Sequence, residues 1–527
     1  MQKQSPRYTR LALALHIAIV VPTTVHAQQL IVNDGSTQTA SGTYDTGTAP
    51  ATSNGFALAA SNQSTITGTG VSAKTGGAGA HALFADQGSL IELWDSSATA
   101  TGSDAYGVLS DASASVRLTR TQVSSSNAIN GHGVVATGGG KVEMTGGSVS
   151  TQRGTGLGST GSGSQIMANG TSITVSSAAP GSHGATAQQG GVIRLGEGTS
   201  VEVTSSSANG GNHGLHASGA GSQVHASGAT ISTAVNNTVT RHNYGAIAQD
   251  GGLIDLGNNT RITTNQSQGF GLVATGSGSI VQGSGATVTT TGFESDAIAV
   301  DAGGKVALSN ISLLTTGSSS RGALSRGAGS RIELTQFDIK AKRTGASATD
   351  GGSISLGNGA VLVSSSGGFG FSAQGSGSRV AAEGVALTID PERSGTTLAY
   401  NGTGVQAIDG GQVTIGSGSS ITLNGSFQND YLLHASGTGS VIDIADTTLV
   451  SGREGSTFSP MGARANAGGQ INFSEGSTLD VKNPGFSLYA TGADSRITAK
   501  GTRFTTNLFT GAPPGSPSVA GLGRTQS

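Results

Sequence analysis

The chain repeats one short pattern of apolar and polar residues along most of its length. The best-formed copy, YGAIAQDGGLIDLGNNTRITT, covers residues 244–264. Its small and aliphatic residues 246–248 lead into a turn at 250–252, then into alternating residues 253–256, a second turn and residues 261–264. Alternation with a period of two is typical of half-buried strands, and Gly, Asn and Asp favour corners. Each copy therefore predicts one coil of three short strands and three corners.

Seventeen copies align on a lead residue, which is the bulky or polar residue before the small-aliphatic pair of each copy. Their spacing, (486 − 56)/16, gives a mean period of about 27 residues. An aliphatic residue follows each lead residue after ten or eleven positions, as Ile66 follows Phe56 and Ile354 follows Thr344. Because one coil cannot bury its inner face alone, the copies must stack on one another. The lead residues are Phe56, His81, Tyr106, His132, Gly156, His183, His213, Tyr244, Phe270, Asp296, Arg321, Thr344, Phe369, Thr403, Tyr431, Met461 and Phe486.

These features predict an all-β chain folded as a right-handed parallel β-helix, a solenoid of about 17 coils. A helical solenoid is disfavoured because each Gly costs about 1 kcal/mol in a helix and no helical stripe is present. Layers about 4.8 Å apart would give a rod on the order of 80 Å long. The first turn has two forms that mostly alternate. One is Gly-Gly, often after Asp as at residues 250–252, and the other is Gly-x-Gly-Ser, as at residues 276–279, which is one residue longer.

The chain divides into three segments. Residues 1–27 begin with basic side chains, continue with an apolar stretch at 11–21 and end on Ala27, which predicts a cleaved secretory signal peptide. The β-helix is expected over residues 28–510. Residues 511–527 are rich in Pro and Gly and are expected to be disordered.

Some copies are longer than the mean and place their extra residues at one edge of the rod. The extra residues lie at 205–212, 234–243, 389–399 and 451–460, always after the third strand and before the next lead residue. Such excursions in solenoids often form a binding face, and drifted surface loops are the alternative.

Composition narrows the class of protein further. The chain has 88 Gly, no Cys, 11% charged residues and a formal net charge of −2. Gly-rich chains are often disordered, but 35% hydrophobic residues at regular positions favour a folded solenoid. The small net charge gives no reason to expect nucleic acid as a partner, and no segment after the signal peptide is apolar enough to span a membrane as a helix. Absence of Cys fits either a chain that threads a second pore unfolded or a repeat core that needs no disulfides.

Four His residues, His81, His132, His183 and His213, raise the question of a metal or catalytic site. Each occupies a lead position that Tyr or Phe fills elsewhere, and their wide spacing differs from that of zinc fingers, so a ladder of stacked flat side chains is favoured. The Asp residues before Gly-Gly are interpreted as turn residues, because the nonapeptide signature of calcium-binding β-rolls is missing. No serine-hydrolase or phosphate-loop motif occurs in its required context. We therefore assign no catalytic, cofactor-binding or metal-ligating residue.

The signal peptide and the glycine-cornered copies from Phe56 to Ile497 together resemble the passenger region of pertactin-like bacterial autotransporters. The resemblance implies a β-helix rod that is exported to the surface of a Gram-negative cell or secreted. It implies host cell-surface or extracellular-matrix molecules, or neighbouring bacterial cells, as partners, together with the secretion and outer-membrane assembly machinery. The family also carries a C-terminal translocator β-barrel, whose strand pattern is not found before Ser527. We therefore expect a truncated or disrupted product or a separate translocator, with a periplasmic location if there is no translocator.

Three functions remain open at this stage. The resemblance favours a non-enzymatic adhesin or virulence factor that binds host or bacterial surfaces or contributes to serum resistance. A polysaccharide-degrading β-helix enzyme is the alternative, although the densest charge cluster, at residues 390–393, is not accompanied by aromatic residues and Trp94 is the only Trp. A truncated remnant without function is the third possibility.

Overall fold

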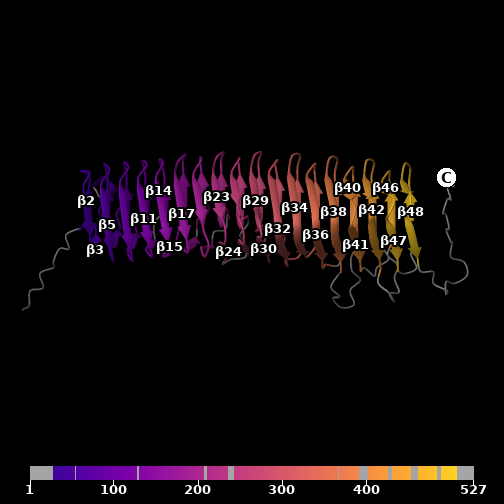
Figure 1. Cartoon of the computed structure of the whole chain (residues 1–527), viewed down its shortest axis with the longest axis horizontal. Helices are drawn as coiled ribbons and strands as arrows, with labels where there is room; N and C mark the ends of the chain where they lie inside the picture. The colour runs from indigo at the N-terminus through magenta and orange to yellow at the C-terminus, as the bar shows by residue number, and fades with distance from the viewer. Residues whose placement is uncertain are drawn as a thin grey trace, which may run out of the picture.

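In the computed structural model the chain forms a straight rod of stacked layers (Figure 1). Within the described residues all regular structure is β-strand, apart from one 3₁₀ turn, η1 (Ala51–Ser53). The predicted all-β parallel solenoid is therefore confirmed. The structure describes residues 28–53, 55–126, 130–177, 179–206, 210–235, 242–365, 367–390, 402–424, 430–452, 461–482 and 488–506.

Each layer begins with one strand of an 18-stranded sheet, which we call the first sheet. All its pairings are parallel, and each strand pairs with its equivalents in the neighbouring layers. Its strands are β1 (Leu30–Val32), β4 (Leu58–Ala60), β7 (Leu83–Ala85), β10 (Val108–Ser110), β13 (Val134–Ala136), β16 (Leu157–Thr160), β19 (Ala185–Gln188), β22 (Leu215–Ser218), β25 (Ala246–Gln249), β28 (Leu272–Thr275), β31 (Ile298–Asp301), β33 (Arg321–Arg326), β35 (Thr344–Thr349), β37 (Phe369–Gln374), β39 (Thr403–Ile408), β42 (Tyr431–Ser436), β45 (Met461–Asn466) and β48 (Leu488–Thr491).

The layers follow the predicted repeat, with one addition. Paired residues in successive layers are 23 residues apart between Val134 and Leu157 and 34 residues apart between Phe371 and Val405. Strand β1 adds a layer before the first lead residue, Phe56, that the sequence pattern did not show. Its second strand, β2 (Thr37–Ala40), has the sequence TQTA, which is too polar to display the alternation.

The second and third strands of the layers form a 32-stranded parallel sheet, the second sheet. In the layer of Tyr244 they are β26 (Leu253–Asp255) and β27 (Arg261–Thr264). Four layers depart from the predicted three strands, because one strand of 11 residues continues through the second corner. At this corner Asn310 has a φ of 50° and is left out of the pairing, while its neighbours stay in register. These four strands are β32 (Lys305–Thr315), β34 (Arg331–Ala341), β36 (Ser353–Val363) and β38 (Arg379–Ile389).

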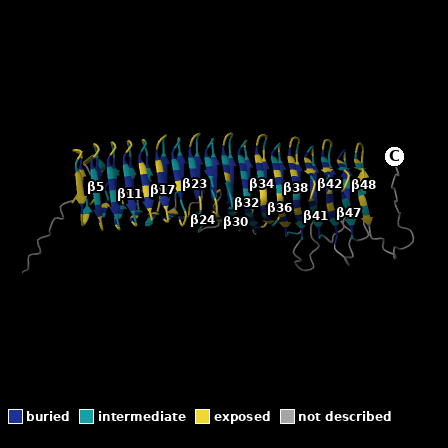
Figure 2. Ribbon diagram, in the orientation of Figure 1, coloured by how far each residue is buried: buried dark blue, intermediate teal, exposed yellow. Residues whose placement is uncertain are grey.

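One continuous aliphatic cluster fills the space between the two sheets (Figure 2). The aliphatic residues that follow the lead residues belong to it, and Ile66, Ile91 and Ile193 are completely buried. Ile497 lies in the last layer and is only partly buried against the same cluster. The predicted shared interior is confirmed, and its stability depends on neighbouring layers because no layer closes the core alone.

The two forms of the first turn alternate because they hydrogen-bond to each other. Residues 276–279 form the Gly-x-Gly-Ser turn of the layer led by Phe270. In this turn the hydroxyl of Ser279 donates to the carbonyl of Thr275 at 2.7 Å. The same hydroxyl accepts the N–H of Gly251, in the Asp-Gly-Gly turn of the preceding layer, at 3.0 Å. Ser378 and Ser440 make equivalent bonds to Gly351 and Gly410. A serine-containing turn therefore satisfies a backbone donor of the glycine turn beneath it, which the sequence pattern alone did not explain.

A column of small residues directly after the lead residues keeps the first and third strands close together. A Cβ built on Gly107 would lie 2.3 Å from Val123, and one on Gly245 would lie 2.2 Å from Ile262, both closer than carbon atoms approach. The assignment of Gly156 as a lead residue was wrong, because Gly156 belongs to this column: its Cβ would lie 2.4 Å from Ile173. The lead residue of that layer is Thr155.

Several sequence predictions lie outside the described residues. They are the signal peptide at 1–27, the tail at 511–527 and the lead residue Phe486. Most of each excursion at 234–243, 389–399 and 451–460 falls there too, together with residues 207–209 of the excursion at 205–212.

We expect the close contact at the small-residue column to appear as energetic coupling between Gly107 and Val123. In the preceding layer Ala82 and Ala98 occupy the equivalent positions, so Ala is tolerated where the third-strand residue is also Ala. Gly107→Ala should destabilise the protein by about 1–3 kcal/mol, because the added methyl group overlaps Val123. The double variant Gly107→Ala/Val123→Ala should cost less than the two single changes together, by about 0.5–3 kcal/mol. Denaturant unfolding of the four proteins measures this coupling, and strict additivity would contradict the steric explanation.

Candidate functional site

The outer face of the first sheet, which we call the trough, carries one column of outward-facing side chains along the rod, the floor residues. The strands of the first sheet share a segment of three residues that pair between layers. The middle residue of the three faces outward, and its two neighbours belong to the core. Ile247, for example, faces outward between the core residues Ala246 and Ala248. Lead residues border one side of these floor residues, and the residues at the strand ends border the other side. The floor residues are Ile31, Ala59, Phe84, Leu109, Val135, Gly158, Thr186, His216, Ile247, Val273, Ala299, Leu324, Ser347, Ser372, Gln406, His434, Arg464 and Tyr489.

Rings of successive lead residues stack along one side of the trough. The ring centroids of His213 and Tyr244 are 5.0 Å apart with an interplanar angle of 7°, and those of Tyr244 and Phe270 are 5.4 Å apart at 4°. Another stacked pair joins His81 and Tyr106 at 4.7 Å. The predicted ladder of flat side chains is therefore confirmed.

The His residues also hold the layers together by a bond that the sequence analysis missed. The Nδ1 atom of His81 accepts the backbone N–H of Tyr106 at 3.0 Å, and that of His213 accepts the N–H of Tyr244 at 3.0 Å. His132 and His183 accept the N–H of the next lead residue in the same way, at 2.9 and 3.2 Å. An acceptor at Nδ1 requires an unprotonated nitrogen, so this role needs neutral imidazoles.

Burial keeps these imidazoles neutral. It lowers the pKa of His81 to about 4 and, with nearby His216, lowers the pKa of His213 to about 3. The pKa of His183 lies well below its ordinary value for the same reasons, and that of His216 falls to about 4 through burial. These His residues therefore fit a structural role, because the Nδ1 atom of each lead imidazole already accepts a backbone N–H.

At the lead position of the layer after Phe270, a carboxylate accepts the hydrogen bond between layers that imidazoles accept elsewhere. Asp296 Oδ1 accepts the backbone N–H of Arg321 at 2.7 Å, and its Oδ2 lies 3.9 Å from the guanidinium of Arg321. Only 5% of the Asp296 side chain is exposed. Burial raises the pKa of this carboxyl to about 6, although Arg321 opposes the shift.

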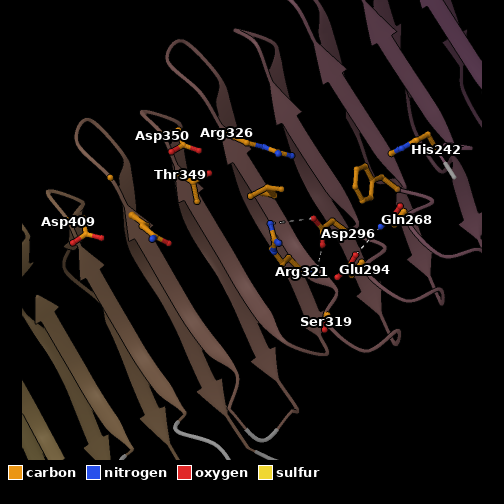
Figure 3. Close-up of a pocket in the computed structure, with 14 residues that line it drawn as sticks. His242, Gln268, Glu294, Asp296, Ser319, Arg321, Arg326, Thr349, Asp350 and Asp409 are labelled. Atoms are coloured by element: carbon orange, nitrogen blue, oxygen red, sulfur yellow. Dashed lines mark hydrogen bonds and ion pairs between the residues drawn. The ribbon is translucent and has the colours of Figure 1, made fainter.

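The trough deepens into a groove of about 750 Å³ where the ring ladder stops (Figure 3). After Phe270 the lead residues are Asp296, Arg321 and Thr344, none of which carries a ring. One end of the groove is bordered by the Phe270 ring, which Tyr244 covers on its other face. The lining residues are His242, Gln268, Phe270, Glu294, Asp296, Ser319, Arg321, Leu324, Arg326, Thr349, Asp350, Gln374, Gly375 and Asp409.

Polar side chains of both signs line this groove. Arg321 and Arg326 stand at the two ends of strand β33, with Leu324 between them on the floor. Gln268 donates to Glu294 at 3.0 Å on the lead-residue side. On the opposite side Asp350 and Asp409 occupy turn positions with φ values of 54° and 53°. The groove thus offers charged donors and acceptors over several layers, which suits an extended polar ligand.

The Asp residues of the Asp-Gly-Gly turns have a conformational role. Asp250 has a φ of 53°, a region that Asp and Asn tolerate better than most residues, and Gly251 follows with a φ of 87°. Gly252 is required for a different reason, because its Cβ would lie 2.2 Å from the carbonyl oxygen of Ala217. Across the residues that the structure describes, no group of three or more His, Cys, Asp or Glu is arranged to hold a metal ion. The same residues contain no helix that could cross a membrane.

Comparisons with known proteins identify no ligand for this chain. No family model matches the chain, and no curated protein matches it in sequence. The structure is similar to a chain from the cryo-EM structure of the Vag8–C1 inhibitor complex, with 17% identity, a TM-score of 0.48, and coverage of 91% of this chain and 98% of that one. A hyper-glycosylated TibA fragment matches with 17% identity and a TM-score of 0.20, over 73% of this chain and 94% of that one. The trough must therefore be interpreted from its own residues.

We expect acidification to weaken the His-bearing layers. In the folded chain the pKa values of His81, His213 and His216 are about 4, 3 and 4. Between pH 6.5 and these values, the unfolded chain binds a proton at each of these residues and the folded chain does not. Each such group contributes stability that is present above pH 6.5 and is lost as pH falls, by about 1.4 kcal/mol per pH unit. Hydrogen exchange at pH 7 and pH 5.5 should show earlier opening of these layers, and His81→Phe should reduce the effect.

Asp296 provides an internal control with the opposite sign. Its folded pKa of about 6 is raised from 3.8, so its contribution is full below pH 3.8 and is lost as pH rises through about 6. Asp296→Asn should remove this opposite contribution without changing the behaviour of the His-bearing layers. Equal pH responses in the His81→Phe variant and the unmodified protein would show that His81 is not the group responsible.

Proposed function

We propose that the protein is an exported, non-enzymatic binding rod, an adhesin-type passenger that attaches to host or bacterial surfaces through the groove of its trough. The groove supports this proposal because it is open, elongated and lined by charged side chains over several layers. A rod built of neighbour-stabilised layers holds such a surface rigidly, so little conformational entropy is lost on binding.

The charged side chains of the groove include some that the fold does not use. Arg326 is exposed and forms no ion pair within the described residues, and the same holds for the carboxylates of Asp350 and Asp409. An exposed guanidinium flanked by carboxylates can form several directional hydrogen bonds to a polar ligand. This set of unpaired groups is the observation that carries the proposal.

A polysaccharide-degrading enzyme is the alternative, and Asp296 is its strongest support. A carboxyl with a pKa of about 6 beside a groove has the property required of a general acid. However, the carboxylate oxygens of Asp296 contact the backbone N–H and the guanidinium of Arg321. Asp296 also occupies the lead position that a neutral His occupies in other layers. Its environment is therefore explained by layer stacking, and we favour binding over catalysis.

The proposed location and partners follow from the passenger resemblance of the sequence. The chain would be exported with its signal peptide and be displayed on the cell surface or secreted, with host cell-surface or matrix molecules, or other bacterial cells, as partners. Contribution to serum resistance is a further role of the same class. A remnant without function would instead show no specific binding and no dependence on groove residues.

Binding of the purified full chain to host cells, matrix proteins and bacterial cells tests the proposal. The double variant Arg326→Ala/Asp350→Asn should weaken binding tenfold or more, because about 1.4 kcal/mol of contact free energy corresponds to a factor of ten. Arg379→Ala is the matched control, since Arg379 is also exposed on a strand but belongs to the second sheet. Equal loss of binding in the control, or none in the groove variant, would count against the groove.

The enzyme alternative is tested with the same proteins. Incubation with neutral and acidic polysaccharides, with and without calcium, should produce no new chain ends. Cleavage that disappears in Asp296→Asn but persists in Arg379→Ala would establish the alternative and overturn the non-enzymatic proposal.

A further inference from the structure

A second part of the trough, near the N-terminus, has a different chemistry from the groove. In the layers led by Phe56, His81, Tyr106 and His132 the floor is apolar, and Phe84, Leu109 and Val135 are partly exposed on it. The ring of Phe84 stacks on that of Phe56 at 4.8 Å, which widens the apolar surface toward the lead residues. We call this surface, made of Phe56, Phe84, Tyr106, Leu109 and Val135, the apolar strip.

Acidic side chains flank the apolar strip on both sides. Asp86 and Asp111 follow the floor strands β7 and β10 in successive layers, and Asp104 lies two residues before Tyr106. Lys74, Arg117 and Lys141 of these layers lie on strands of the second sheet and Arg120 lies at its corner, while Arg153 lies past the far end of the strip, two residues before the lead residue Thr155.

Within the described residues, neither of the two carboxylates beside the floor forms an ion pair. Burial and the neighbouring charge of Asp111 raise the pKa of Asp86, and Asp86 Oδ1 is buried without a hydrogen-bond partner in the described part of the chain. Asp111 accepts only its own turn's N–H, from Ala112 at 2.7 Å. Like charges in adjacent layers repel each other, so a bound cation beside Asp86 and Asp111 would relieve an unfavourable arrangement.

We propose that the apolar strip binds a cationic amphipathic helix of another protein. Apolar side chains of the helix pack over Phe84, Leu109 and Val135, and Lys or Arg side chains on one flank reach Asp86 and Asp111. The proposal stands on surface chemistry separate from the groove, so it does not depend on the proposed function.

The geometry of the trough favours a helix over an extended strand. The backbone groups of β7, β10 and β13 already pair with neighbouring layers, so the sheet offers no free edge to an added strand. A helix satisfies its own backbone, and its pitch of about 5.4 Å is close to the layer spacing of about 4.8 Å. Each turn can therefore place one apolar side chain over one layer. Four layers span about 19 Å, which is the length of a helix of roughly 13 residues.

A synthetic peptide tests this inference without knowledge of the natural partner. The probe is a fluorescently labelled amphipathic helix of about 14 residues, with Leu on one face and Lys on the other. Its first control carries Glu in place of Lys, and its second has the same composition in an order without an apolar face. We expect saturable binding of the Leu/Lys helix to the full chain by fluorescence anisotropy, weakened by salt, and at least tenfold weaker binding of both controls.

Variants of the full chain locate the binding. Asp86→Asn/Asp111→Asn should weaken the Leu/Lys helix about tenfold and reduce its salt dependence, and Leu109→Ser should weaken it without changing the salt dependence. Glu92→Gln/Glu143→Gln is the matched control, because both residues lie on the outer face of the second sheet in the same stretch of layers. Circular dichroism shows whether each variant keeps its fold.

Three results would overturn the inference. They are equal binding of the Glu peptide, binding that the Asp86/Asp111 variant leaves unchanged, and equal weakening by the second-sheet control. The groove variant Arg326→Ala/Asp350→Asn should bind the helix normally, so failure of the groove proposal and failure of this one are separate outcomes.

Discussion

Parallel backbone pairing between successive layers is the constraint on which the rest of this structure depends. Because each strand pairs with its equivalent in the layers before and after it, every position becomes a column along the rod. Residues in a column stand about 4.8 Å apart, so each must be compatible with copies of its own kind. Rings stack on rings at the lead position, small residues follow them, and a serine turn bonds to the glycine turn beneath it. The core, the corners and the trough all follow from this rule.

Columns that face outward are free to change along the rod, because the core does not use them. At the lead position His81 and His213 give way to Asp296, yet the bond from the next backbone N–H is kept. Where Thr344 replaces a ring, the backbone ladder of β35 continues and only the surface changes, which leaves the groove. Ligand chemistry can therefore vary on this face without altering the fold.

The sequence predicted the features that recur within one copy. The strands, both turn forms, the aliphatic interior and the ring ladder all leave a local pattern, as residues 244–264 show. It did not predict what depends on the layer beneath, such as the bond from Gly251 to Ser279 or from Tyr106 to His81. Those partners are about 25 to 28 residues away, and the offset between layers varies from 22 to 34. Gly156 was misassigned for a related reason, since the adjacent lead residue Thr155 has no ring to mark it. The groove was not predicted, and the signal that could have indicated it is the run of lead residues without rings at Asp296, Arg321 and Thr344.

Ion pairs between layers are found on both outer faces of the rod, and Arg321 and Asp296 form one of them on the trough side. On the second sheet many charges pair between layers, as Lys305 does with Glu333 at 2.9 Å and Arg120 with Asp95 at 2.6 Å. On the trough side, Asp86, Asp111 and Arg326 form no ion pair within the described residues. Exposed ion pairs contribute little to stability, so the pairs on the second sheet add little to what the backbone ladders provide. Beside rings and partly exposed aliphatic residues, these unpaired groups of the trough are the ones that the proposed partners would use.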